Sequence, residues 1–291
     1  MKRALALLPI LAAPALAHGG AHPAEPGAAG WTTDPWVTLP LLLAAGLYGV
    51  GLVRLRRRSG LGRDVLMRSA WLFAAGWFVL AASVVSPLHE AGERSFTMHM
   101  IEHELIMLVA ALLLVASRPA AAMLWALPQP ARRAFGGGTQ HPLWRFFTDP
   151  IVATVLQSAA MWAWHAPALF DRALGHEGWH VAQHVSFLLT ALLFWWAMLH
   201  GRSGPGVSAL CLFATSLVGG MLGALMAFSN SPWYAGYAAM GMTPYGLTPV
   251  EDQQLAGLLM WIPGGLVHAG AALYFVWRWL KLSERDVARA G

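Results

Sequence analysis

The chain has 291 residues, of which 57% are hydrophobic and only 11% are charged, with a formal net charge of +5. Because soluble domains carry roughly a quarter charged residues, this composition excludes an ordinary soluble globular domain and indicates a lipid environment. The basic residues lie between apolar runs rather than in one patch, so the positive charge does not indicate a nucleic-acid partner. The single Cys211 lies within an apolar run, which excludes a disulfide framework and a CxxC site.

The first residues have the pattern of a secretory signal peptide. Lys2 and Arg3 precede a short apolar stretch that ends in the small-residue motif Ala15-Leu16-Ala17, and this pattern predicts a signal peptide over 1–17. An uncleaved anchor is the alternative, although the apolar stretch is short for a hydrocarbon core of about 30 Å. Residues 18–34 are rich in Gly, Pro and Ala and are predicted to form an exported flexible tail.

Seven apolar segments of membrane length follow this tail. They lie at 35–53, 65–85, 97–116, 149–166, 180–199, 207–228 and 253–277. Each is close to the ~20 residues that a spanning helix needs, and the runs are continuous rather than alternating, which favours helices over a barrel. The sequence therefore predicts an all-α membrane protein with a seven-helix membrane domain over 35–280 and a tail over 281–291.

The distribution of Arg and Lys predicts the orientation. One set of connections, with the C-terminus, carries Arg54, Arg56, Arg57, Arg58, Arg63, Arg118, Arg132, Arg133, Arg145, Arg202, Arg278, Lys281, Arg285 and Arg289. The opposite connections hold only Arg94 and Arg172. The positive-inside rule therefore predicts an outer N-terminus and a cytoplasmic C-terminus, as expected of a multi-pass protein of the bacterial inner membrane.

Histidines gather at the predicted outer ends of these helices. His99 and His103 are four residues apart and Glu102 lies between them, so all three fall within about 100° of one helix face. The fifth segment repeats this spacing at His180 and His184. Further polar residues at the same level are His165, His176, Gln183, Asp252 and Gln253.

Two such pairs on facing helices can complete a four-ligand metal site. The predicted ligands are His99, His103, His165, His180, His184, Glu102 and Asp252, and the predicted supporting residues are Gln183, Gln253 and His176. The alternative is that these side chains only form hydrogen bonds between helices. Methionines in the outer half would suit monovalent copper, although methionine is also ordinary packing material.

Other polar residues have less specific interpretations. His89 and its neighbours Glu90, Glu93 and Arg94 are interpreted as a polar outer loop. Thr248, Pro249 and Glu251 predict a capping box at the start of the last helix. His268 lies too deep for the outer cluster, and it either forms a hydrogen bond between helices or marks a second, deeper polar site.

Three blocks in order resemble one protein family. They are "SPLHEAGERSFTMHMIEHELIMLVAALLLVASRP", "WAWHAPALFDRAL" followed by "HVAQHVSFLLTALLFWW", and "TPVEDQQLAGLLMWIPGG". The chain resembles the multi-spanning CtaG family of cytochrome c oxidase assembly factors over roughly residues 35–280. The resemblance carries over His99, His103, His165, His180, His184, Asp252 and Gln253.

The resemblance implies a protein, not itself an enzyme, that matures a haem-copper oxidase at the step that supplies copper. Its implied partners are the oxidase subunits, exported copper chaperones and the lipid bilayer. Glu104 departs from the pattern, because an apolar residue is expected there; turned inward, it would favour harder metals over monovalent copper. Two alternatives are a membrane di-metal oxidoreductase and a haem-binding electron-transfer protein with paired axial histidines.

Overall fold

The computed structural model describes residues 30–32, 34–58 and 62–290, and within these ranges the protein is all-helical, with no strand. The predicted signal peptide over 1–17 and most of the predicted tail over 18–34 lie outside the described residues. Six described helical segments are long and apolar enough to cross a membrane. They are Pro35–Arg58, Arg63–Val85, Phe96–Ala116, Glu177–His200, Pro205–Ala227 and Pro249–Asp286.

These segments coincide with six of the seven apolar runs in the sequence. The first two are α1 (Pro35–Arg58) and α2 (Arg63–Val85), and the fifth run forms α11 (Glu177–His200) and the sixth α12 (Pro205–Ala227). The other two segments are each interrupted by a short π-helical turn. The third run forms α4 (Phe96–Glu104), the π-helical turn η1 (Leu105–Ala110) and α5 (Ala111–Ala116). The seventh run forms α14 (Pro249–Leu259), the π-helical turn η3 (Met260–Gly264) and α15 (Gly265–Ala290).

The remaining run, 149–166, forms the shorter helix α9 (Pro150–Trp164). Asp149 caps its start by accepting hydrogen bonds from the backbone N–H groups of Ile151 and Val152, and the chain leaves the helix at His165, two residues before Pro167. At 1.5 Å per residue its 15 residues span about 22 Å. The helix packs between α11 and α12.

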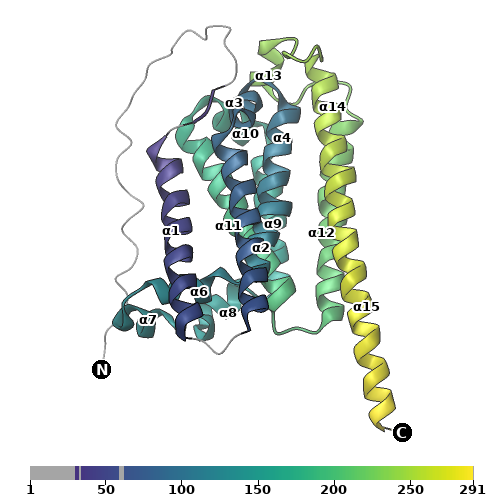
Figure 1. The fold of residues 1–291 in the computed structure, drawn as a ribbon. Helices are drawn as coiled ribbons and strands as arrows, with labels where there is room; N and C mark the ends of the chain where they lie inside the picture. The colour runs from purple at the N-terminus through teal and green to yellow at the C-terminus, as the bar shows by residue number, and fades with distance from the viewer. Residues whose placement is uncertain (1–29, 33, 59–61, 291) are drawn as a thin grey trace.

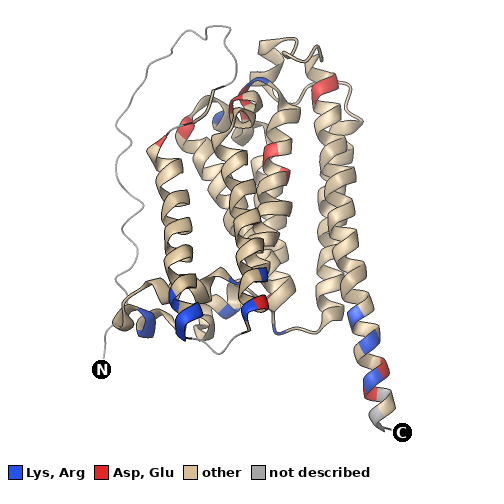
Figure 2. Ribbon diagram, in the orientation of Figure 1, with Lys and Arg blue, Asp and Glu red and all other residues tan. Residues whose placement is uncertain are grey.

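Short helices connect the long ones at both ends of the bundle. They are α3 (Pro87–Arg94), α6 (Pro119–Ala126), α7 (Gln129–Phe135), the 3-10 turn η2 (Gly138–Gln140), α8 (Pro142–Phe147), α10 (Pro167–Gly175) and α13 (Ala235–Met240). Helices α3, α10 and α13 lie at one end, and α6, α7 and α8 lie at the other (Figure 1). Lys and Arg gather at the end that carries α6, α7 and α8, whereas most Asp and Glu lie at the opposite end (Figure 2).

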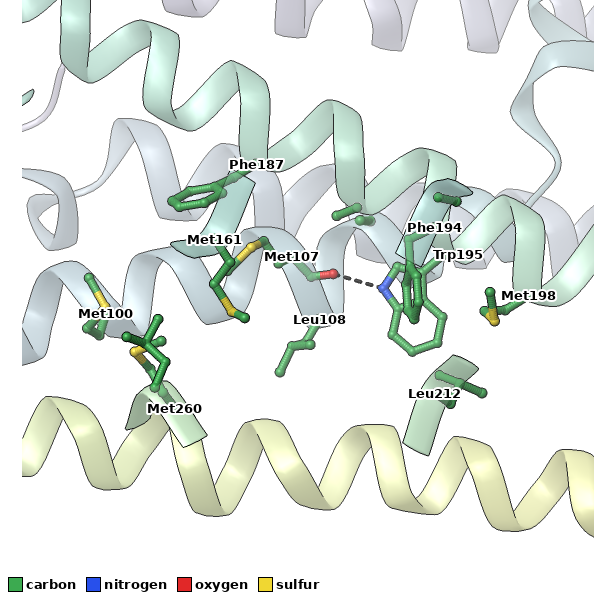
Figure 3. Close-up of a cluster of buried hydrophobic side chains, with 14 of the residues drawn as sticks. Met100, Met107, Leu108, Met161, Phe187, Phe194, Trp195, Met198, Leu212 and Met260 are labelled. Atoms are coloured by element: carbon green, nitrogen blue, oxygen red, sulfur yellow. Dashed lines mark hydrogen bonds between the residues drawn. The ribbon is translucent and has the colours of Figure 1, made fainter. Parts of the chain in front are cut away.

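The core of the bundle lies between α11, η1 and α12. Phe187, Phe194 and Trp195 of α11 are fully buried there against Met107 and Leu212 (Figure 3). Trp195 Nε1 donates a hydrogen bond of 2.9 Å to the carbonyl oxygen of Met107. Because Met107 lies in a π-helical turn, where the regular α-helical bonding pattern is interrupted, this bond links the turn firmly to α11.

Helices α12 and α14 approach so closely that only glycine fits between them. A Cβ atom added to Gly257 would lie 2.5 Å from the Gly223 carbonyl oxygen and 2.6 Å from the Ala227 nitrogen. Because these are backbone atoms, they cannot move aside as a flexible side chain would. This contact fixes the position of the helix that carries Asp252.

We predict that Gly257→Ala lowers the thermal unfolding temperature of the detergent-purified protein, at a cost of about 1–3 kcal/mol for overpacking. The matched control is Gly270→Ala in α15, where an added Cβ meets no atom within 4 Å. Since alanine is the better helix former, the control is expected to match or slightly exceed the wild type. An unchanged unfolding temperature for Gly257→Ala would contradict the close contact.

Candidate metal centre

Five histidines from three helices form one cluster at the end of the bundle opposite α6, α7 and α8. α4 contributes His99 and His103, whose ring centroids lie 4.2 Å apart, and α11 contributes His180 and His184, at 4.5 Å. Across the two helices, His99 lies 5.3 Å from His180 and His103 lies 5.0 Å from His184. The two predicted pairs therefore face each other.

The fifth member, His89, comes from α3. Its ring lies 5.1 Å from that of His180 and 5.6 Å from that of His184. The interpretation of this stretch as a polar outer loop was wrong, because residues Pro87–Arg94 form a helix that turns His89 inward. Ser86 caps that helix by accepting from the Leu88 N–H, and Pro87 occupies its first turn. The Ser-Pro pair was the available sequence signal.

Contacts from distant segments hold α3 against α4. A Cβ on Gly92 would lie 3.2 Å from the Cα of His99, so the two backbones are nearly in contact. Tyr237 in α13 donates a hydrogen bond of 2.5 Å to the Gly92 carbonyl oxygen. His89 thus depends on a residue almost 150 positions away for its place in the cluster.

Glu102 lies between the two histidine pairs and is fully buried. Its Oε1 lies 2.8 Å from Nδ1 of His89 and 3.8 Å from Nε2 of His184. Burial lowers the pKa of His89, but the hydrogen bond to Glu102 and the charge of that carboxylate outweigh it and raise the pKa above its ordinary value. With Nδ1–H bound to the carboxylate, Nε2 of His89 presents a lone pair, as in the carboxylate–histidine pairs of metal sites.

Two groups of three histidines have the spacing of a metal site. In each group, one nitrogen per ring lies within 4.8 Å of the others; the groups are His89, His180 and His184, and His99, His103 and His184. Two nitrogens bound to one ion at about 2.0–2.1 Å lie roughly 3.3–4 Å apart. Small side-chain rotations therefore suffice for either group to close on a metal ion.

Several buried ring nitrogens of this cluster lack a hydrogen-bond partner among the described residues. Both ring nitrogens of His99 and of His103 are buried without a hydrogen-bond partner among the described residues, and so is Nε2 of His184. A buried unpaired polar group costs about 1–3 kcal/mol. Hydrogen bonding between helices, the alternative drawn from the sequence, would have satisfied these atoms. The donor set fits a metal ion instead.

Asp252 was predicted as a ligand, but the structure assigns its carboxylate another contact. Oδ1 accepts from the Ser95 hydroxyl at 2.8 Å, and Oδ2 accepts from the Phe96 N–H at 2.6 Å. Thr97 donates its hydroxyl to the Asp252 carbonyl oxygen at 2.9 Å. Asp252 therefore caps the N-terminus of α4 from α14 and sets the height of His99 and His103, rather than joining the histidines.

The other predicted residues lie around the cluster. Gln253 accepts from the Trp233 N–H and donates to the Ser231 carbonyl, so it holds the connection after α12. His176 is exposed and precedes α11 as its N-cap, so it does not face the other histidines from within the helix. Gln183 is buried, and its amide has no hydrogen-bond partner among the described residues.

His165 is buried beside the cluster. Its Nδ1 lies 2.7 Å from the Met161 carbonyl oxygen, and its Nε2 lies 3.4 Å from the Met100 sulfur. Its ring contacts Phe170 and Phe187. Those two phenylalanines also pack against His99 and His103, respectively. His165 is thus a neighbour of the cluster rather than a member of either three-histidine group.

A cavity of about 560 Å³ reaches the cluster from the side. Its wall includes His89, His180 and His184 together with Glu93 and residues of α1. His99 and His103 are almost fully buried behind them. An ion can therefore meet the more accessible histidines first and the buried pair second.

The comparisons with known proteins identify the family of the chain. The family model described as the cytochrome c oxidase caa3 assembly factor matches residues 46–282. The chain belongs to this family. The family resemblance drawn from the three sequence blocks is thereby confirmed.

Three curated relatives also match, and all are uncharacterized mycobacterial proteins. The relatives from Mycobacterium bovis and Mycobacterium tuberculosis are each 26% identical over 276 residues, and the one from Mycobacterium leprae is 25% identical over 282. Each match covers 89% of this chain but only 40–41% of the relative, so the chain spans about two fifths of the length of these relatives. No solved structure matches the chain significantly.

We predict that Asp252→Ala lowers the unfolding temperature, because it leaves the Ser95 hydroxyl and the Phe96 N–H buried without a partner. The loss is expected to be about 1–3 kcal/mol. The control is Asp64→Ala, since Asp64 is exposed in the first turn of α2. Equal unfolding temperatures for the two variants would contradict the capping role.

We also predict that His89→Ala lowers the amount of copper bound per purified chain after loading with copper, whereas His141→Ala leaves it unchanged. His89 faces the cluster, whereas His141 is exposed at the start of α8, at the opposite end of the bundle. Removing one of three ligands is expected to weaken affinity at least 10-fold. Equal losses in both variants would mean that the cluster boundary is misplaced.

Proposed function

We propose that this protein is a membrane assembly factor that binds copper at the five-histidine cluster and supplies it to a haem-copper cytochrome c oxidase. One observation carries the proposal: a group of buried imidazole nitrogens from facing helices has no partner among the described residues. The family supplies the process, because an oxidase of this type needs copper to become active. We propose further that the protein supplies the metal rather than catalysing a reaction.

We propose an orientation of the chain in which this cluster lies at the outer side of the membrane. Lys and Arg gather at the end of the bundle away from the cluster (Figure 2). The positive-inside rule makes that end cytoplasmic, so the cluster faces the periplasm. In this orientation, exported copper chaperones deliver copper to the cluster.

The proposed orientation requires an odd number of crossings. α1 begins at the end of the bundle that carries α3, whereas α15 finishes at the opposite end (Figure 1). The six long segments give an even number, and α9 supplies the seventh crossing between α8 and α10. Its length of about 22 Å is tolerable because α11 and α12 pack against it and shield it from much of the lipid.

The donor set suits transfer of copper rather than permanent storage. Imidazole is a good ligand for copper, and Glu102 adds one negative charge that offsets the charge of the ion. His184 belongs to both three-histidine groups, so an ion can exchange between an accessible group and a buried one by changing its other two ligands. Such exchange permits release to a partner that docks at the open side.

The test combines metal analysis with oxidase assembly. We predict that His99→Ala/His103→Ala/His184→Ala purified from copper-supplemented cells holds about one copper ion per chain fewer than the wild type, because both three-histidine groups lose ligands. In a deletion strain, the same variant should leave the oxidase short of copper, and added copper should partly restore it.

His141→Ala, at the opposite end of the bundle, is the matched control and should behave as the wild type in both measurements. If the triple variant retained the wild-type copper content, the metal-binding proposal would fail. If it lost copper but supported full oxidase assembly without supplementation, the cluster would bind the metal for another purpose.

A further inference from the structure

A second polar site lies deeper in the bundle, where the sequence contributes Glu104 and His268. The two side chains line a cavity of about 30 Å³ between α4, α9, α12 and η3. Gln157 and the thioethers of Met107, Met161 and Met260 complete much of its wall. Both π-helical turns of the protein's described part border this cavity, and such turns often accompany functional sites.

The cavity presents several polar atoms that have no hydrogen-bond partner among the described residues. Oε2 of Glu104 and Oε1 of Gln157 are buried and have no hydrogen-bond partner among the described residues. Nδ1 of His268 lies 2.9 Å from the Gly264 carbonyl oxygen. Because that oxygen can only accept, Nδ1 carries the proton and Nε2 of His268 is left as a lone pair.

The hydroxyl groups of the wall do not supply the missing protons. Thr215 donates to the Cys211 carbonyl oxygen at 2.9 Å, and Ser216 lies 3.5 Å from the Gly265 carbonyl oxygen. The Gln157 amide donates to the Met107 sulfur at 3.3 Å. A cavity lined by acceptors whose neighbouring donors are engaged elsewhere is complementary to a cation.

Glycine brings the carboxylate close to His268. A Cβ on Gly264 would lie 2.9 Å from Oε2 of Glu104, so the carboxylate rests against bare backbone. His268 lies one helical turn after Gly264 and hydrogen bonds to its carbonyl. Glu104 therefore points away from the five-histidine cluster and toward this second site.

The volume of the cavity and the soft sulfur ligands in its wall determine which ion it can bind. A volume of about 30 Å³ suits one water-sized particle, which excludes a hydrated ion or an organic cation. Three thioethers are soft ligands that favour monovalent copper, whereas alkali and alkaline-earth ions prefer oxygen ligands. The sulfurs of Met100, Met107, Met161 and Met260 gather at one end of the buried cluster, away from Met198 (Figure 3).

Two possible metal ligands, the His165 imidazole and the Met100 thioether, connect this cavity to the outer cluster. His165 must donate through Nδ1 to the Met161 carbonyl at 2.7 Å, so its Nε2 faces the Met100 sulfur at 3.4 Å with no proton between them. Met100 lies between His99 and His103 in α4, and Met161 lines the inner cavity. Soft ligand atoms thus continue from one site toward the other.

We propose that the cavity between Glu104, Gln157 and His268 is a second, intramembrane binding site for monovalent copper. The thioethers of Met107, Met161 and Met260 supply soft ligands, and the Glu104 carboxylate balances the charge of the ion. This proposal deepens the function proposed above and takes from it the identity of the metal. The site would hold an ion within the bundle, separate from the five-histidine cluster.

The test loads detergent-purified protein with Cu(I) under anaerobic conditions and measures copper per chain after removal of free metal. His99→Ala/His103→Ala/His184→Ala, which removes ligands from both three-histidine groups of the outer cluster, should retain about one ion per chain. Adding Glu104→Gln and His268→Gln to that variant should remove this ion, while Glu104→Gln/His268→Gln alone should keep the outer one. Unfolding temperatures of all variants show that each is folded.

Replacement of sulfur provides an independent test that keeps charge and volume. In the outer-cluster variant, X-ray absorption should show sulfur ligands to copper, and Met161→Leu/Met260→Leu should reduce the sulfur signal to the single thioether of Met107. Met198→Leu, a buried methionine away from the cavity, is the control and should change nothing.

The two proposals fail in different ways. If the outer-cluster variant holds no copper, or if its copper survives both the Glu104/His268 and the Met161/Met260 substitutions, the inner site is refuted. If the outer-cluster variant holds as much copper as the wild type, the outer site fails instead. A retained ion with only oxygen and nitrogen ligands would also overturn the proposal for a soft-metal site.

Discussion

A buried imidazole inside a lipid-embedded bundle must find a partner, because neither lipid nor bulk water can supply one. In this protein, His99 and His103 are almost fully buried, and neither has a hydrogen-bond partner among the described residues. Hydrophobic packing alone would favour leucine at such positions. The surrounding structure is arranged to hold these nitrogens in place: Asp252 fixes the start of α4, and Gly92 and Tyr237 hold α3 against it.

The need of the buried imidazoles for a partner also accounts for the different contacts that the carboxylates make at this end of the bundle. Glu102 is placed to orient His89 and to offset positive charge within the cluster. Both carboxylate oxygens of Asp252 accept hydrogen bonds from the start of α4, so Asp252 positions the helix that carries His99 and His103. Glu104, the next carboxylate along the chain from Glu102, turns toward His268 because helix geometry separates consecutive acidic positions around the axis.

Much of this architecture follows from the sequence, because spanning segments and their ends are local properties. Continuous apolar runs located the long helices, and the four-residue spacing of His99 with His103 and of His180 with His184 located the two facing pairs. The capping box of Thr248 and Glu251 is confirmed. What local pattern cannot give is the direction of a side chain that depends on tertiary contacts. His89 was missed because α3 is aimed by Gly92 and Tyr237, and Asp252 was assigned to the metal because its depth does not reveal its partners.

Copper K-edge X-ray absorption of the purified wild-type protein reveals directly whether the buried histidines bind copper. Copper binding by these histidines predicts scattering from coordinated nitrogen at about 2.0 Å, together with the more distant signals of at least two imidazole rings. Copper with sulfur and oxygen neighbours but no imidazole signal would contradict it.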